Sequence, residues 1–297
     1  MSNWTAWVLV SSVFLALYDI AKKASVQGNA VLPTLLCSTC FGCAAYMGSL
    51  ALCGRFPDVA SGLSPEVVSL SAVKCVIVGT SWVFTFCALR TLPISIATPI
   101  RASAPALVFA VAFVLYGERP TFLQLVGMAA VFAGYFAFSW AGKYEGIDFF
   151  RSRAVWCAIA GAFCSAVSSL WDKYLFQVRD LPVEEVQFVF QVGLVAFYGA
   201  ALAAELAFLP QERRVAFEWR WSIPLVGMLL AAADWLYFTG LAYDDAPISA
   251  ASLLRRFSVA ITFVLGARFF HETNLLRKGI ALAAIVVGVV LICCPAD

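Results

Sequence analysis

Long apolar runs separated by short polar breaks dominate the pattern along this chain. A helix that crosses a lipid bilayer needs about 20 apolar residues, and ten runs in the sequence approach that length. They are Trp4–Ile20, Ala30–Cys53, Cys75–Leu89, Pro93–Tyr116, Phe122–Ala141, Ala154–Phe176, Val186–Phe208, Ser222–Tyr243, Pro247–Phe270 and Leu275–Cys294. The third run is short, and Lys74 is expected to mark the point where its helix enters the bilayer. The pattern predicts an all-α integral membrane protein with ten transmembrane helices.

The composition agrees with a lipid environment. Of the 297 residues, 62% are hydrophobic and 13% are charged, whereas soluble domains carry about 25% charged residues. The net charge of +2, without a basic stripe, argues against nucleic-acid binding. The N-terminus lacks the positive region of a cleaved signal, so we interpret it as the start of the first membrane helix.

Chemical motifs are few. Cys37, Cys40 and Cys43 share one helix face, but no histidine lies near them, and we interpret them as small residues at a helix contact. No catalytic cluster is found, and no G-x-x-x-x-G-K-[ST] loop points to direct ATP drive. The sequence therefore predicts neither an enzyme nor a bound cofactor or metal.

An internal repeat adds a second pattern. The segment that begins at Pro93 and contains Arg101 recurs at Pro247 with Arg255, a shift of 154 residues (247 − 93). We divide the chain into a first five-helix repeat at 1–141, a connecting loop at 142–153 and a second five-helix repeat at 154–297. An odd number of helices per repeat forces the halves into opposite orientations. Inverted repeats of this kind are typical of secondary transporters, whose substrate site lies between the halves near the bilayer midplane; a channel or a membrane enzyme fits less well.

Arginines inside the apolar runs are the main candidates for function, because intramembrane charges are costly. Arg101 and Arg255 each lie eight residues into a helix, or about 12 Å at 1.5 Å per residue. We interpret both as cavity residues that bind an anionic group such as a carboxylate or phosphate. The alternative is that they pair with protein acids or extend to the interface.

Asp234 lies about 18 Å into its helix, twelve residues past Ser222. It is expected to bind a coupling proton or a substrate amine, or else to neutralise Arg255 or Arg256. Trp82 and Trp235 are deep enough to stack on a substrate, although core packing explains them equally well. The helices that begin at Pro93 and Pro247, together with the third and eighth, are expected to line the cavity.

Asp19 and Asp172 occupy equivalent places near the ends of the first and sixth helices. One hypothesis assigns them, with Arg256, to gating or coupling, each acid pairing with its arginine on alternate sides of the membrane. The alternative is two permanent ion pairs: Asp19 with Lys22 or Lys23, and Asp172 with Lys173 or nearby cations.

Two short segments resemble a known family. Glu118–Pro120 is followed by Gly127 and Gly134, and His271–Asn274 is followed by Gly279 and Gly288. This pattern resembles the end of each repeat in the EamA-type branch of the drug/metabolite transporter superfamily. Pro105 also stands where that family often has proline, although Val259 replaces it in the second repeat. The resemblance implies the ten-helix plan and transport of small metabolites such as amino acids, nucleotide sugars or sugar phosphates.

The orientation of the termini is predicted differently by two arguments. Loops on the N-terminal side hold about five Lys and Arg residues and the opposite loops about twelve, so the positive-inside rule places both termini outside. The family resemblance implies cytoplasmic termini instead.

The function that we expect is secondary transport of a small polar metabolite, anionic or zwitterionic, by alternating access in the plasma (inner) membrane. Its partners would be that substrate, the lipid bilayer, and either a proton or an exchanged metabolite, in a monomer or homodimer. The alternatives are an exporter of amphipathic compounds or amino acids without an anion site, and a non-transporting membrane protein that kept the fold.

Overall fold

The structure is a computed structural model of the chain. It describes residues 3–94, 96–97, 100, 122–123, 125–127, 129–130, 133–134, 137, 151–243, 255, 257–270 and 275–293. Within these ranges every regular element is a helix. The expected runs Pro93–Tyr116 and Phe122–Ala141 lie largely outside them, and the structure therefore does not establish a count of ten.

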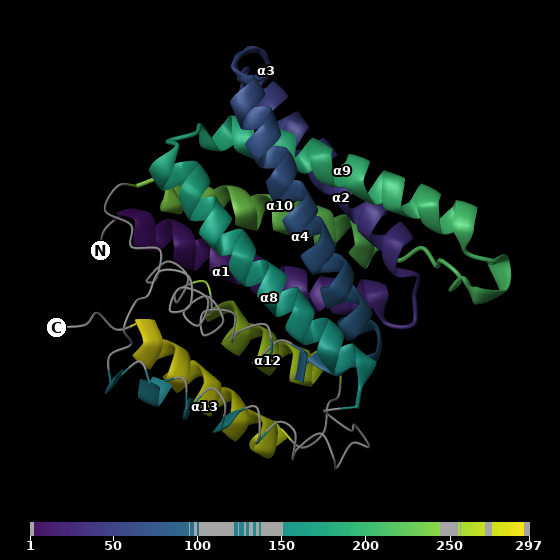
Figure 1. Ribbon diagram of the computed structural model, residues 1–297, viewed down its shortest axis with the longest axis vertical. Helices are drawn as coiled ribbons and strands as arrows, with labels where there is room; N and C mark the ends of the chain where they lie inside the picture. Colours follow the sequence, from purple (N-terminus) through teal and green to yellow (C-terminus); the bar gives the residue numbers. More distant parts are fainter. Residues whose placement is uncertain are drawn as a thin grey trace.

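Eight long helices make up the described bundle (Figure 1). They are α1 (Asn3–Val26), α2 (Val31–Leu52), α4 (Pro65–Thr91), α8 (Arg153–Lys173), α9 (Val183–Phe208), α10 (Ser222–Leu241), α12 (Phe257–Phe269) and α13 (Leu275–Cys293). Three short elements connect them: α3 (Phe56–Ser61), the π-helical turn η1 (Tyr174–Val178) and the 3-10 turn η2 (Gln211–Arg213). Within the part of the chain that the structure describes, six helices are long and apolar enough to cross a bilayer, namely α1, α2, α4, α8 with η1, α9 and α10.

Two predicted boundaries were wrong. The first helix continues past Ile20 to Val26. The third begins at Pro65 rather than Cys75, because Ser64 caps its N-terminus by accepting a hydrogen bond from the backbone N–H of Val67. Lys74 therefore lies inside the helix and not at its point of entry into the bilayer. Lysines ended the apolar runs in the sequence, but their ammonium groups have partners in the fold and do not end the helices.

Helices from the two halves of the chain pack against one another. α1 and α2 contact α10, and α4 contacts α8 and α9. Gly42 of α2 meets Gly227 of α10 so closely that a Cβ added to Gly227 would lie 1.8 Å from the Ser38 carbonyl oxygen. Small residues allow such close backbone approach between membrane helices. By contrast, nothing lies within 4 Å of a Cβ built on Gly48.

α1 and α4 run parallel, and both of their ends are joined. Near their C-terminal ends, the Lys23 ammonium donates to the carbonyl oxygens of Leu89 and Leu92 at 2.8 and 2.7 Å. These are carbonyls that a helix end leaves without an intrahelical partner. Near their N-terminal ends, Trp4 and Val67 belong to one apolar cluster. This parallel register fixes where the charged residues of the two helices lie along the bundle.

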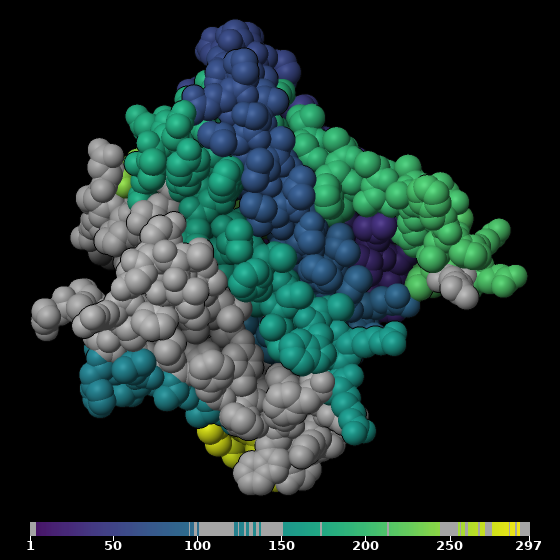
Figure 2. Space-filling view, in the orientation of Figure 1, coloured from purple at the N-terminus to yellow at the C-terminus, as the bar shows by residue number. Residues whose placement is uncertain are grey.

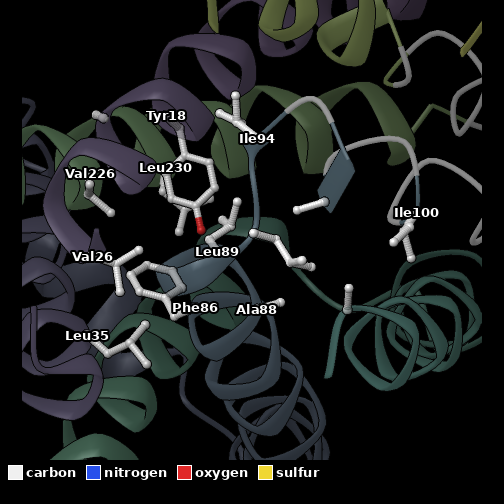
Figure 3. Packing of buried hydrophobic residues seen from close by; sticks show 14 of the residues in the cluster. Tyr18, Val26, Leu35, Phe86, Ala88, Leu89, Ile94, Ile100, Val226 and Leu230 are labelled. Atoms are coloured by element: carbon white, nitrogen blue, oxygen red, sulfur yellow. The ribbon is translucent and has the colours of Figure 1, made fainter. Parts of the chain in front are cut away.

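The two largest of three apolar clusters among the described residues make up most of the core. In the larger one, Tyr18 of α1, Phe86 and Leu89 of α4, and Leu230 of α10 lie together (Figure 3). The second gathers the first turns of α1, α4 and α9 with η1 and the last turns of α10. We call the end of the bundle where this second cluster lies the aromatic end. Its members are Trp4, Val8, Val67, Leu175, Phe176, Val186, Tyr237, Phe238 and Leu241.

The outer faces of the helices are apolar. α4 and α8 lie side by side on the face shown in Figure 2. Val76 of α4 and Trp156 of α8 are 55% and 56% exposed, and Val73 and Phe163 are exposed beside them. A soluble protein would seldom expose so continuous an apolar surface, whereas a bilayer covers it. The buried polar side chains lie inside the bundle instead.

Candidate functional site

A cavity of about 120 Å³ lies inside the bundle. Its walls come from α1, α4, α8 and α10, with Phe190 of α9 and Arg255 completing it. The third and eighth helices and Arg255 were expected at this site. The first and sixth helices, here α1 and α8, were not included in that prediction. Every charged residue of the wall carries a partner of opposite sign.

Lys74 is the central cation of the site. Its side chain is 1% exposed and forms an ion pair with Asp172 of α8. The ammonium nitrogen also lies 3.9, 5.0 and 5.7 Å from the ring centroids of Phe238, Phe190 and Phe176. Aromatic faces attract a cation, and more strongly when it is desolvated. The cation is therefore held inside the membrane by one carboxylate and three rings.

Lys74 is not among the site residues predicted from the sequence, although the chain carries a signal for it. Ser64 followed by Pro65 and Glu66 is a typical helix start, with an N-cap residue, a proline at the first helical position and an acid in the first turn. Starting the helix there places Lys74 nine residues inside, about 14 Å at 1.5 Å per residue. That depth makes it an intramembrane cation like the arginines.

Arg255, one of the two cations proposed as partners of Asp234, pairs with that acid. The distance from its Nη2 to Asp234 Oδ1 is 2.6 Å, and the guanidinium carbon lies 4.0 Å from the centroid of the Tyr237 ring. Asp172 also interacts electrostatically with Arg255 and Asp234. Lys74, Asp172, Asp234 and Arg255 therefore form one group of two cations and two carboxylates, which we call the four-charge cluster.

The third pair lies toward the opposite end of the cavity. Lys22 bonds Asp19 within α1 at 2.7 Å, and both side chains are buried. The Lys22 ammonium also lies 4.3 Å from the Tyr18 ring centroid. Because α1 and α4 are parallel, Lys22 near the end of α1 lies far from the aromatic end, whereas Lys74 lies nearer to it. The cavity thus has charged groups toward both of its ends.

The remaining predicted site residues have different positions. Trp82 lines the cavity, edge-on to Phe190 at a centroid distance of 6.2 Å. Trp235 does not line it, because its indole packs edge-on against Trp7, with centroids 5.9 Å apart. Arg101 and Arg256 lie outside the described residues.

The two acids of the gating hypothesis are both paired in this structure. Asp19 bonds Lys22, one of the two lysines expected for a permanent pair. Asp172 bonds Lys74, a cation from the other half of the chain. The partner of Asp172 is 98 positions away along the chain, so local sequence carried no sign of it.

The profile of the EamA-like transporter family matches residues 2–140 and again residues 152–294. The chain belongs to the EamA-like transporter family. It is thus an integral membrane protein of a transporter family, as the two repeat-end segments predicted, and the family is not an enzymatic one.

One solved structure is similar to this EamA-like transporter over nearly all of both chains. It is titled only "Crystal structure of protein", and the match covers 98% of this chain and 96% of the other, with a TM-score of 0.66 and 20% sequence identity. At that identity the likeness concerns the fold. A comparison with curated proteins gave no match.

Proposed function

We propose that this EamA-like transporter carries a small anionic or zwitterionic metabolite through the cavity by alternating access, with Lys74 and Arg255 binding its acidic group. The observation that carries the proposal is the four-charge cluster. Two cations face one cavity, Lys74 buried and Arg255 partly buried, and each is balanced by a carboxylate of the protein.

Such a cluster suits a ligand that exchanges with the protein's own acids. A substrate carboxylate or phosphate presents the same oxygen geometry as Asp172 or Asp234, and Arg255 can bind it in a bidentate manner. When it displaces a carboxylate, that acid becomes free to accept a substrate amine or a proton. This exchange would suit a zwitterion, or an anion that travels with a proton, and a cavity of about 120 Å³ favours a small molecule.

The contacts across the aromatic end support an alternating mechanism. The Lys74–Asp172 pair joins the two halves of the chain, and two further pairs do the same near the surface: Arg55 with Glu184, and Arg179 with Glu66. We infer that breaking these contacts, and separating the apolar cluster beneath them, opens this end. Asp172 would then act in gating, as the repeat suggested, while Asp19 keeps or exchanges Lys22 at the other end.

The proposal is tested with charge-neutral double variants, which remove a cation without leaving its acid unpaired. We would reconstitute Arg255→Met/Asp234→Asn and Lys74→Met/Asp172→Asn in liposomes and measure counterflow across a panel of carboxylates, phosphates and amino acids. Arg268→Met is the matched control, because Arg268 is exposed near the end of α12. We expect saturable counterflow of an anionic or zwitterionic solute by the wild type and the control, reduced at least tenfold in both double variants.

Two other outcomes would contradict the proposal. Counterflow of neutral amphipathic compounds that is unchanged in both double variants would identify an exporter without an anion site. A complete lack of counterflow by the folded wild-type protein, across the whole panel, would favour a non-transporting membrane protein that kept the fold.

A further inference from the structure

Hydroxyl groups form one wall of the cavity beside the four-charge cluster. Ser165, Ser168 and Ser169 of α8 line it together with Ser81 and Thr85 of α4. The three α8 serines are spaced i, i+3 and i+4, so they share one helix face, and Asp172 follows on that face. We call these five residues the hydroxyl wall.

Three of these hydroxyls are fixed by bonds to backbone carbonyl oxygens. Ser81 donates to Gly161 at 2.8 Å, Thr85 donates to Ser81 at 2.9 Å, and Ser169 donates to Ser165 at 3.1 Å. Each oxygen keeps lone pairs with which to accept a hydrogen bond. The wall therefore offers several acceptors whose positions are set by the fold.

Ser168 differs from these three. Its side chain lines the cavity and is only 9% exposed, yet its hydroxyl has no hydrogen-bond partner among the described residues. Burying a hydroxyl without a partner is unfavourable. A polar group that enters the cavity would satisfy both its donor and its acceptor capacity.

The rest of the cavity lining is different in character. Leu15, Val78, Trp82 and Leu230 contribute apolar and aromatic surface. A molecule that fills the space would thus meet both hydroxyl groups and apolar carbon surface. Polyhydroxylated carbon chains and rings present both kinds of surface, because their hydroxyls project from a skeleton of C–H groups.

The wall also has a direction. From Asp172 back to Ser165 is seven residues, a rise of about 10 Å along α8 at 1.5 Å per residue. The wall therefore begins at the four-charge cluster and extends away from it. An acidic group bound by Lys74 and Arg255 would leave the rest of the molecule beside Ser169, Ser168 and Ser165.

We infer that the substrate is a polyhydroxylated organic anion, whose acidic group binds at the four-charge cluster and whose hydroxyls bond the hydroxyl wall. This inference rests on the proposed function and adds the substrate class to it. The acidic group is a carboxylate or a phosphate, and the test separates the two.

The test compares ligands that differ only in their hydroxyls. Gluconate is paired with hexanoate, and sorbitol 6-phosphate with hexyl phosphate, so each pair has equal carbon count and the same acidic group. Each ligand competes with the solute whose counterflow is measured, in the wild type and in Ser165→Ala/Ser168→Ala. The inhibition gives the ratio of affinities within each pair. Ser69→Ala is the control, because Ser69 is an exposed serine of α4 away from the cavity.

In at least one pair the hydroxylated ligand should bind about tenfold more tightly to the wild type and to Ser69→Ala. The double serine variant should reduce that ratio at least threefold while the affinity for the ligand without hydroxyls stays unchanged. Equal affinities within both pairs, or a ratio that the double variant does not alter, would overturn the inference. The proposed function would still stand if simple anions bound in an Arg255-dependent manner, and it would fail separately if they did not.

Discussion

Removing the Lys74 ammonium should destabilise the folded protein severely. In Lys74→Met the Asp172 carboxylate stays buried and loses its ion-pair partner, the same ammonium group that three aromatic rings surround. Breaking a buried pair by removing one partner typically costs about 3–5 kcal/mol. For 297 residues, with an unfolding entropy of roughly 2.1 cal/mol/K per residue, that loss lowers the midpoint of thermal unfolding by about 5–8 °C.

The double variant Lys74→Met/Asp172→Asn distinguishes the contribution of the ion pair to stability from that of the side-chain volume. Replacing both charges by uncharged groups of similar size is often close to neutral, because no ion is left unpaired in a medium of low dielectric constant. We therefore expect the double variant to regain at least half of the stability that the single variant loses. Arg268→Met, which removes an exposed charge, should unfold within about 2 °C of the wild type, since an exposed charge contributes at most about 1 kcal/mol.

Intrinsic tryptophan fluorescence of the detergent-solubilised protein measures these midpoints, since the chain has nine tryptophans. The reasoning would be refuted if Lys74→Met unfolded at the wild-type temperature, because the lysine would then not be a desolvated partner of Asp172. It would also be refuted if the double variant were as unstable as the single one, because the loss would then come from packing and not from charge.

Three further predictions use other parts of the fold. Gly227→Ala should be destabilised by about 1–3 kcal/mol or more through overpacking at the α2–α10 contact, whereas Gly48→Ala, with open space around its Cβ, should unfold like the wild type; thermal unfolding checks both. Lys23→Met should cost about 1.5–3 kcal/mol for each hydrogen bond it loses to the end of α4, and a wild-type midpoint would show that those bonds contribute nothing. Reversing the charge of Arg55 alone should raise the rate at which a thiol reagent labels a cysteine placed in the cavity by Ser168→Cys, and Arg55→Glu/Glu184→Arg should return that rate to its starting value. An unchanged labelling rate in the single variant would show that this pair does not hold the end closed.

The lipid environment of the protein was predictable from the sequence, because it depends on the composition and on the length of the apolar runs. Apolar runs of about 20 residues have one stable environment, the bilayer, and the described spans lie where those runs are. The motifs at the repeat ends were also enough to predict the family. Asp234 and Arg255, which line the cavity, could be singled out from the sequence, because an intramembrane charge stands out against an apolar run.

The partners of those charges were decided only by the tertiary structure. Lys74 finds Asp172 across the two halves of the chain because α4 packs on α8, and no periodicity in either helix encodes that meeting. Packing likewise turns Trp82 toward the cavity and Trp235 toward Trp7. A sequence shows that a buried charge must be neutralised, since its transfer out of water is costly, but which side chain neutralises it depends on the contacts between helices and on their rotation.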